Sequence, residues 1–328
     1  MSRLLLPLIA LLLTSAVHAA ETLTVYSGRN ERLVGPLYKA FTAKTGIEVK
    51  VRYGETPQLV ATLMEEGAKS PADVFVAQDA GALGALAKAQ LLQPLPKAQV
   101  EKVDARFRSP EALWVGLSGR ARVVAYNTAK VKPEQLPTGI QGFTEPAWKG
   151  RIGWAPTNGS FQAFVTALRL MKGDAAAKKW LEGVKANAPR TYKNNAAIVE
   201  ALGRGEIDVG FVNHYYLYAA KKDQGEALPV ANHFLAAGDP GTLVNVSGAA
   251  VLKSSKKAEA AQQLIAFLLD TQAQQHFAQE TFEYPLVPGV AAASALPALS
   301  KVGSPDLDLS KLEDLKGTLR LLQETGVL

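Results

Sequence analysis

The sequence predicts an α/β protein in which two lobes are joined by two extended crossings. Strand-like and helix-like segments alternate in two separate sets, over residues 23–77 and 151–212, and such alternation is typical of mostly parallel sheets with helices on their faces. Residues 114–126 and 243–252 are extended runs, longer than the average strand of about five to six residues. We expect each run to pass from one lobe to the other and leave a ligand-sized cleft between them.

The first set begins with a strand over residues 23–26. Apolar side chains between Leu33 and Phe41 follow a helical spacing that stops at Gly46, because glycine favours the backbone that ends a helix. Alternating apolar residues over 47–53 predict the next strand. A second helix, capped by Thr56 and ended by Gly67, then leads to a buried strand over 73–77.

The second set starts after a polar, proline-containing segment over residues 94–109. Its predicted strands are 151–155 and 207–212, and its predicted helices are 161–171, 175–186 and 195–202. Helices near 256–278 and 309–324 close the chain.

Composition narrows the functional classes. The 328 residues are 48% hydrophobic and 20% charged, which is a globular composition with room for about two domains. The net charge of +6 is spread along the chain, whereas nucleic-acid-binding proteins usually concentrate their positive charge. Cysteine is absent, so disulfides, zinc–thiolate sites, iron–sulfur clusters and thiol nucleophiles are excluded. We expect a mild preference for anionic ligands and no nucleic-acid partner.

Residues 1–19 have the pattern of a secretory signal peptide. Arg3 supplies a positive charge, residues 4–13 form a short apolar run, and a cut is expected after Ala19 or Ala20. The alternative is a buried first helix. The signal peptide predicts export of the mature chain to the periplasm.

Common catalytic motifs are missing. The chain has no phosphate-binding P-loop, no G-x-S-x-G nucleophile motif and no H-E-x-x-H zinc motif. Its histidines are far apart in sequence. We therefore expect a binding protein rather than an enzyme.

Tyr215 and Tyr216 follow the predicted strand 207–212. Ligands of open α/β sheets bind at the carboxyl ends of strands, and ionised phenolates are hard oxygen donors suited to a hard trivalent cation. The alternative is that both tyrosines are amphipathic core residues of a helix.

Two further segments suit an anion. Asn158, Gly159 and Ser160 link a strand to a helix, where backbone N–H groups can hold an anion, although an ordinary helix cap uses the same residues. Arg120 and Arg122 share one face of an extended run. They could clamp an anion in the cleft or lie solvated on an exposed face.

Together, these segments make the chain resemble the bacterial periplasmic ferric-iron-binding proteins, the iron-carrying subunits of ABC importers. The resemblance covers nearly the whole mature chain in order. It rests on residues 25–30, 71–75, 117–124, 148–153, 213–216, 239–241, 247–253 and 283–286.

The resemblance implies a type II periplasmic-binding-protein fold. Lobe 1 would comprise residues 20–120 and 246–288, and lobe 2 residues 121–245 and 289–328. The family's tyrosine ligands of Fe³⁺ fall on Tyr215 and Tyr216. Its synergistic anion, such as carbonate or phosphate, would lie at Asn158, Gly159, Ser160, Asn194 and Asn213, with Arg120 contributing where carbonate is used. Arg122 matches no anion contact of the family.

Two positions depart from the family pattern. Many members have a histidine ligand where this chain has Asn30 and a glutamate ligand where it has Gln78, so lobe 1 offers only amides and the neighbouring Arg29. The resemblance implies a monomeric carrier that delivers Fe³⁺ to an inner-membrane ABC permease. The alternatives are a carrier of a small organic anion or phosphonate and, with less support, an extracytoplasmic enzyme of the same fold.

Overall fold

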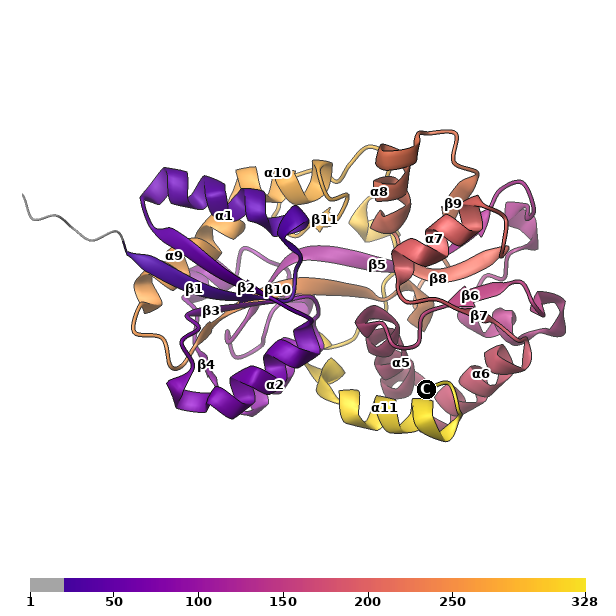
Figure 1. Ribbon diagram of the computed structural model, residues 1–328, viewed down its shortest axis with the longest axis horizontal. Helices are drawn as coiled ribbons and strands as arrows, with labels where there is room; N and C mark the ends of the chain where they lie inside the picture. The colour runs from indigo at the N-terminus through magenta and orange to yellow at the C-terminus, as the bar shows by residue number, and fades with distance from the viewer. Residues whose placement is uncertain (1–20) are drawn as a thin grey trace, which may run out of the picture.

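The computed structural model describes residues 21–328, and the predicted signal peptide lies outside this range. Two α/β lobes lie side by side along the long axis of the molecule (Figure 1), and one continuous strand belongs to the sheets of both lobes. The α/β class and the two-lobed arrangement predicted from the sequence are therefore confirmed. No helix in the described range is long and apolar enough to cross a membrane.

The sheet of lobe 1 has the strand order β2-β1-β3-β10-β5. β1 pairs in parallel with β2 and β3, whereas β10 runs antiparallel to both β3 and β5. The strands of this sheet are β1 (Thr22–Ser27), β2 (Glu48–Tyr53), β3 (Val74–Ala77), β10 (Val244–Leu252) and β5 (Val115–Asn127), with β4 (Leu92–Gln93) and β11 (Tyr284–Pro285) at β10 and β5. Its main helices are α1 (Glu31–Thr45), α2 (Thr56–Glu66), α3 (Ala80–Lys88), α9 (Ala258–Leu268) and α10 (Thr271–Gln279).

The sheet of lobe 2 continues in the order β5-β8-β6-β7, with β9 also beside β5. β6 pairs in parallel with β7 and β8. Its remaining strands are β6 (Ile152–Trp154), β7 (Arg190–Thr191), β8 (Val209–Asn213) and β9 (Val230–His233). Its helices are α5 (Gly159–Lys172), α6 (Asp174–Ala186), α7 (Asn195–Gly203), α8 (Tyr215–Gln224) and α11 (Leu315–Glu324).

β5 is the joint between the lobes. Residues 115–121 pair with β10 and β11, and residues 122–127 pair with β8 and β9. All 13 residues of the strand are buried, so its two arginines lie inside the molecule rather than on a solvated face. β10, the other expected crossing, pairs only with strands of the first sheet, and the chain leaves lobe 2 just before Val244.

Three local predictions differ from the structure. Thr56 does not cap α2, because its hydroxyl accepts a hydrogen bond from the backbone N–H of Gln78 (3.1 Å) and Glu55 occupies the cap position. The helix expected over 256–278 is two helices, since Asp270 caps the start of α10 through the N–H of Ala273. The helix expected over 309–324 is a 3₁₀ turn, η8 (Leu309–Glu313), followed by α11.

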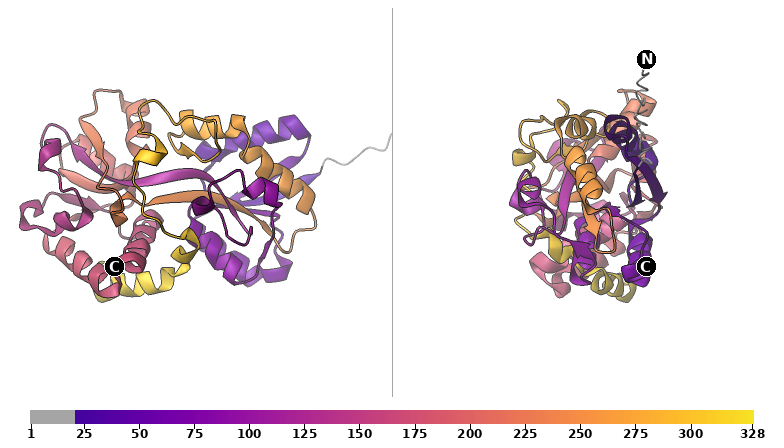
Figure 2. Two further views of the ribbon diagram at one scale, coloured as in Figure 1. Left: turned by 180° about the vertical axis from the view of Figure 1, so that it is seen from behind. Right: turned by 90° about the vertical axis from the view of Figure 1, so that its left-hand side faces the viewer.

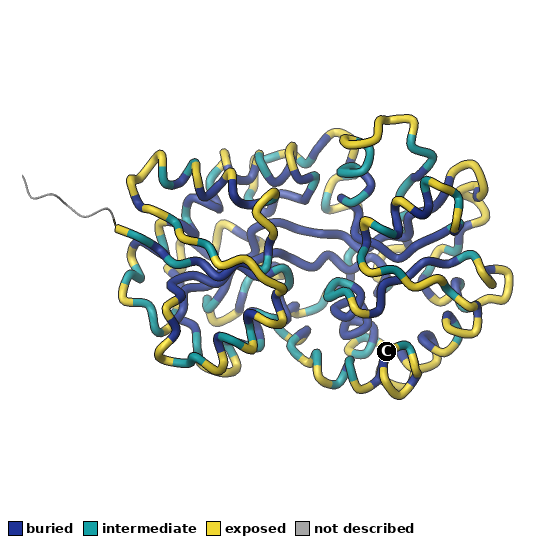
Figure 3. Tube along the Cα trace, in the orientation of Figure 1, coloured by how far each residue is buried: buried dark blue, intermediate teal, exposed yellow. Residues whose placement is uncertain are grey.

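The hydrophobic core follows the sheets. Buried backbone runs along both crossings and through the centre of each lobe, whereas the outer faces of the helices are exposed (Figure 3). Lobe 1 has one large apolar cluster, and lobe 2 has two smaller ones on either side of its sheet. Each lobe therefore has its own core, which lets the lobes act as separate bodies.

The C-terminal segment touches both lobes. The view from behind shows it passing along the junction between them (Figure 2). η8 packs on α3 of lobe 1, where Lys88 pairs with Glu313 (2.6 Å). α11 follows at once and packs on α5 of lobe 2, where the hydroxyls of Thr166 and Thr318 are 2.7 Å apart. Only Asp314 separates the two elements.

Candidate functional site in the cleft between the lobes

A cleft of about 590 Å³ lies between the lobes. Lobe 1 contributes the segments after β1, β2 and β3, and lobe 2 contributes the starts of α5, α7 and α8. Most of its lining is polar, and it includes seven of the residues singled out from the sequence, namely Arg29, Asn30, Gln78, Asn158, Asn194, Tyr215 and Tyr216.

The two tyrosines lie on the side of lobe 2 that faces the cleft. β8 ends at Asn213 and α8 begins at Tyr215, so the pair lies where the backbone changes from strand to helix. The rings are stacked, with centroids 4.3 Å apart and planes inclined by 27°. Burial raises the pKa of the Tyr216 phenol well above its usual value, and the neighbouring Tyr215 adds to the rise. A cation would therefore have to displace a firmly held proton.

His214 fixes the start of this pair. Its Nδ1 accepts a hydrogen bond from the backbone N–H of Ala121 (3.1 Å), so Nε2 carries the proton and donates it to the carbonyl of Phe282 (2.7 Å). The ring is fully buried, and burial lowers its pKa to about 4. A neutral imidazole thus ties the residue before Tyr215 to both β5 and the segment before β11.

Arg122 is the guanidinium that reaches the predicted anion turn. Its Nη1 donates to Ser160 Oγ (3.3 Å), Asn195 Oδ1 (3.4 Å) and Asn213 Oδ1 (3.2 Å). All three partners are neutral, and burial lowers the pKa of Arg122 to about 9, although the two phenols oppose the shift. Of the two arginines on β5, Arg122 is therefore the one that contacts this turn.

Asn195, which the sequence did not single out, organises the turn. Its Nδ2 donates to Asn158 Oδ1 (3.0 Å) and Ser160 Oγ (3.3 Å), while its Oδ1 accepts from the N–H of Asn213 (2.8 Å). Ser160 Oγ also donates to Asn158 Oδ1 (2.6 Å). Asn194 caps α7 through the N–H of Ala197. Asn195 is adjacent to Asn194, which the resemblance had indicated, but only the fold shows that Asn195 contacts the turn.

Arg120 is buried, and part of its guanidinium group has no hydrogen-bond partner among the described residues. It is 2% exposed, and neither Nε nor Nη1 has a hydrogen-bond partner within residues 21–328. Its charge acts on Asp79, on His214 and on Tyr216. A buried guanidinium without partners is costly, so this residue is suited to receive an anion.

Arg29 comes from lobe 1 and lines the cleft itself, whereas Arg120 and Arg122 are not among its lining residues. It forms a buried ion pair with Glu283, whose other carboxylate oxygen accepts from the hydroxyl of Ser118. Burial alone would lower the pKa of Arg29. Glu283 and the phenols of Tyr215 and Tyr216 outweigh this effect and raise the pKa above its usual value. Arg29 is therefore a permanent cation facing the tyrosines, with its charge balanced from behind by Glu283, which sequence reasoning missed.

The lobe 1 wall adds Asn30 and Gln78. Asn30 Oδ1 accepts from the N–H of Leu33 (3.2 Å) and caps α1. Gln78 lies at the end of β3, where its backbone N–H is held by Thr56. Within the described residues, no group of three or more His, Cys, Asp or Glu side chains could hold a metal ion. The anionic oxygen donors that the lining can offer a metal are therefore the phenols of Tyr215 and Tyr216 and, from lobe 1, the phenol of Tyr53 and the carboxylate of Glu55.

The fold and the cleft define a two-lobed binding protein that holds a small ligand between its lobes. A family model for bacterial extracellular solute-binding proteins matches residues 69–310. The chain is 37% identical to the major ferric iron-binding protein of Neisseria meningitidis serogroup B, with 98% of this chain and 97% of that protein covered. It is 33% identical to the Fe(3+)-binding periplasmic protein of Serratia marcescens, with 95% and 93% covered. The chain belongs to the bacterial extracellular solute-binding protein family.

Solved structures agree with this assignment. Iron-bound HitA from Pseudomonas aeruginosa superposes with a TM-score of 0.89 at 38% identity, covering 93% of this chain and 99% of HitA. The IdiA (FutA) protein of Trichodesmium, in complex with iron and citrate, gives a TM-score of 0.81 at 33% identity, again covering 93% and 99%. The relatives from Neisseria meningitidis and Serratia marcescens are named as binding proteins rather than enzymes.

Proposed function

We propose that this protein captures Fe³⁺ in the interlobe cleft, together with a synergistic anion, and delivers it to an ABC permease. The stacked pair Tyr215 and Tyr216, facing a polar cleft beside three buried arginines, is the observation that carries the proposal. The ferric-binding names of relatives that match almost the whole chain support it.

The metal would rest on lobe 2. Two phenolates are hard anionic donors, and they leave Fe³⁺ with one positive charge and open coordination positions. Asn30 and Gln78 are neutral amides, and Asn30 Oδ1 already caps a helix, so these two residues cannot supply the missing charge. The remaining positions fall to an anion and water.

The anion would bind between the lobe 2 turn and β5. Arg122 with Ser160, Asn195 and Asn213 forms one side, and Arg120 brings unpaired N–H donors from the same strand. Carbonate and phosphate both suit charge-assisted hydrogen bonds from guanidinium groups. Citrate is a third candidate, because the Trichodesmium neighbour holds iron with citrate. The same arginines would serve a carrier of a small organic anion without iron, which is the competing function.

Ferric titration distinguishes these functions. Fe³⁺ supplied with carbonate, phosphate or citrate should produce a visible phenolate-to-iron charge-transfer band. Tyr215→Phe or Tyr216→Phe removes one hard donor and keeps the ring, so iron affinity should fall by orders of magnitude while the melting temperature of the iron-free protein stays nearly constant. A colourless protein stabilised equally by the anions alone would support the organic-anion carrier.

The same proposal includes the cellular compartment and the oligomeric state of the protein. The N-terminal pattern predicts a periplasmic protein that starts at Ala20 or Glu21, and we expect it to act as a monomer. Intact-mass measurement of protein from the native cell envelope tests the cleavage. A mature chain that still carries residues 4–13 would refute it.

A further inference from the structure

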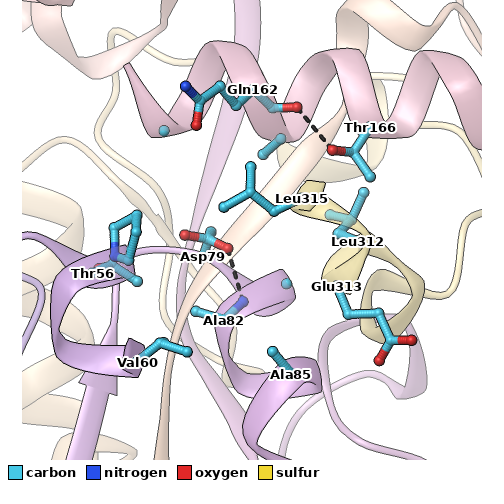
Figure 4. Close-up of a pocket in the computed structure, with 14 residues that line it drawn as sticks. Thr56, Val60, Asp79, Ala82, Ala85, Gln162, Thr166, Leu312, Glu313 and Leu315 are labelled. Carbon is cyan, nitrogen blue, oxygen red and sulfur yellow. Dashed lines mark hydrogen bonds between the residues drawn. The ribbon is translucent and has the colours of Figure 1, made fainter. Parts of the chain in front are cut away.

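A second, smaller pocket of about 110 Å³ lies between the lobes and is separate from the cleft with the tyrosines. Figure 4 shows its walls, which come from α2 and α3 of lobe 1, α5 of lobe 2 and the C-terminal segment. Most of the lining is apolar and small, as at Val60, Ala82, Ala163, Leu312 and Leu315. An apolar cavity of ~150 Å³ holds a molecule the size of benzene, so this pocket suits a compound of that size or smaller.

Two acceptor groups face this apolar space. Asp79 reaches into the pocket from the start of α3, and one of its carboxylate oxygens accepts from the N–H of Ala82 (3.0 Å). Gln162 enters from α5 and is 8% exposed. Its amide nitrogen donates to the carbonyl of Pro156 (3.1 Å), which leaves its side-chain oxygen as an acceptor.

The other polar groups of the pocket are engaged. Thr56 accepts from the N–H of Gln78, Thr166 pairs with Thr318, and Glu313 forms an ion pair with Lys88. Arg120 is the guanidinium that acts on Asp79, but no ion pair joins them in the described range, and burial raises the pKa of this carboxyl. The pocket thus offers the carboxyl of Asp79 and the side-chain oxygen of Gln162 as acceptors for a ligand.

We propose that this pocket binds a small compound with a primary ammonium group and a short apolar body. The ammonium donates to the Asp79 carboxylate of lobe 1 and the Gln162 side-chain oxygen of lobe 2, and the apolar body lies against Val60, Ala82 and Ala163. A charged donor–acceptor pair is stronger than a neutral hydrogen bond. Because the ligand contacts both lobes, it favours their present relative position.

The test uses iron-free protein, so its result does not depend on the proposed function. n-Butylammonium is titrated into ¹⁵N-labelled protein while the backbone amide shifts of α3 and α5 are followed, and n-butanol serves as the uncharged probe. We expect saturable shifts in both helices with n-butylammonium and roughly tenfold weaker binding of n-butanol.

Asp79→Asn is the matched variant, because asparagine caps helices as well as aspartate does but carries no charge. It should weaken n-butylammonium binding roughly tenfold and leave n-butanol unaffected. Ala163→Leu fills the pocket from lobe 2 and should abolish both. Absence of saturable shifts in α3 and α5, or equal binding of the two probes to wild-type and Asp79→Asn protein, would overturn the proposal.

Discussion

Among the residues of the candidate site, Arg122 is the one whose contacts were least predictable from the sequence. As an alternate position of β5 it shares a strand face with Arg120, but the fold places its Nη1 against the turn that begins α5. Its hydrogen-bond partners are all neutral, and burial lowers its pKa, so a bound anion would stabilise its charge. The residue therefore belongs to the proposed anion site.

Replacing Arg122 tests this role. Arg122→Gln should lower iron affinity about 10- to 100-fold, because a charge-assisted hydrogen bond contributes roughly 1.5–3 kcal/mol. The loss should shrink when titrations are made without any small anion. Titrations in degassed, phosphate-free buffer, and then with bicarbonate restored, measure it. The exposed Arg320→Gln is the control, and equal affinity of wild-type and Arg122→Gln protein under both conditions would exclude Arg122 from the site.

His214 predicts a pH dependence of folding. Its pKa is about 4 in the folded protein against 6.5 as its ordinary value, so between these pH values the unfolded chain binds a proton that the folded chain does not. Stability should fall by about 3 kcal/mol as the pH drops from 6.5 to 4 and show no further change from this residue below that. Urea unfolding of iron-free protein measures this slope. His214→Gln should remove it, and a slope unchanged in that variant would assign it to other groups.

At the scale of elements, the contact between α3 and η8 is unusually close. A Cβ atom at Gly84 would lie 2.5 Å from the carbonyl oxygen of Ser310, which is too near for η8 to keep its place. Glycine in the middle of a helix costs about 0.5–1 kcal/mol relative to alanine. The close packing of α3 against η8 that Gly84 permits offsets this local cost.

Gly84→Ala should therefore destabilise the protein by about 1–3 kcal/mol despite its better helix propensity. Gly35→Ala is the matched control in α1, because its nearest neighbour would be the flexible Glu31 side chain at 3.0 Å. That variant should be neutral or slightly stabilising. Denaturant unfolding of the two variants and of the wild-type protein measures this difference in stability. Equal midpoints would show that η8 moves away from α3 without a loss of stability.

Most elements could be predicted from local pattern, whereas contacts between distant segments could not. The helix stops at Gly46 and Gly67 and the long strand around Arg120 follow from glycine geometry and apolar spacing, and the structure has them. Thr56 failed as a cap because a partner 22 residues away took its hydroxyl. The same limit hid Asn195 and Glu283, since their partners come from other elements.

At the scale of the whole molecule, two exposed ion pairs join the lobes near the tyrosines, in addition to the buried hydrogen bond between His214 and the carbonyl of Phe282. Arg32 on α1 pairs with Asp223 on α8 (3.2 Å), and Lys222 pairs with Glu280 (2.9 Å). All four side chains are largely exposed, and such pairs contribute only ~0–1 kcal/mol each. Closure of the lobes should therefore depend on the ligand.

Small-angle X-ray scattering tests this dependence. Binding of iron and its anion should reduce the radius of gyration, because the ligand contacts both walls of the cleft and draws the population toward the closed form. The bend is expected at residues 121–122 of β5 and just before Val244. Tyr216→Phe protein at the same iron concentration is the control. Superimposable profiles of loaded and iron-free wild-type protein would contradict ligand-driven closure.

The insertion of β10 between β3 and β5 sets an order for folding. As a chain emerges from its N-terminus, every strand of the second sheet is present once residue 233 appears, whereas the first sheet lacks a central strand until residue 252. Until then, one edge of β3 and the lobe 1 half of β5 have no strand partner, and unpaired strand edges favour aggregation. The sheet that begins the sequence is therefore completed after the sheet that follows it.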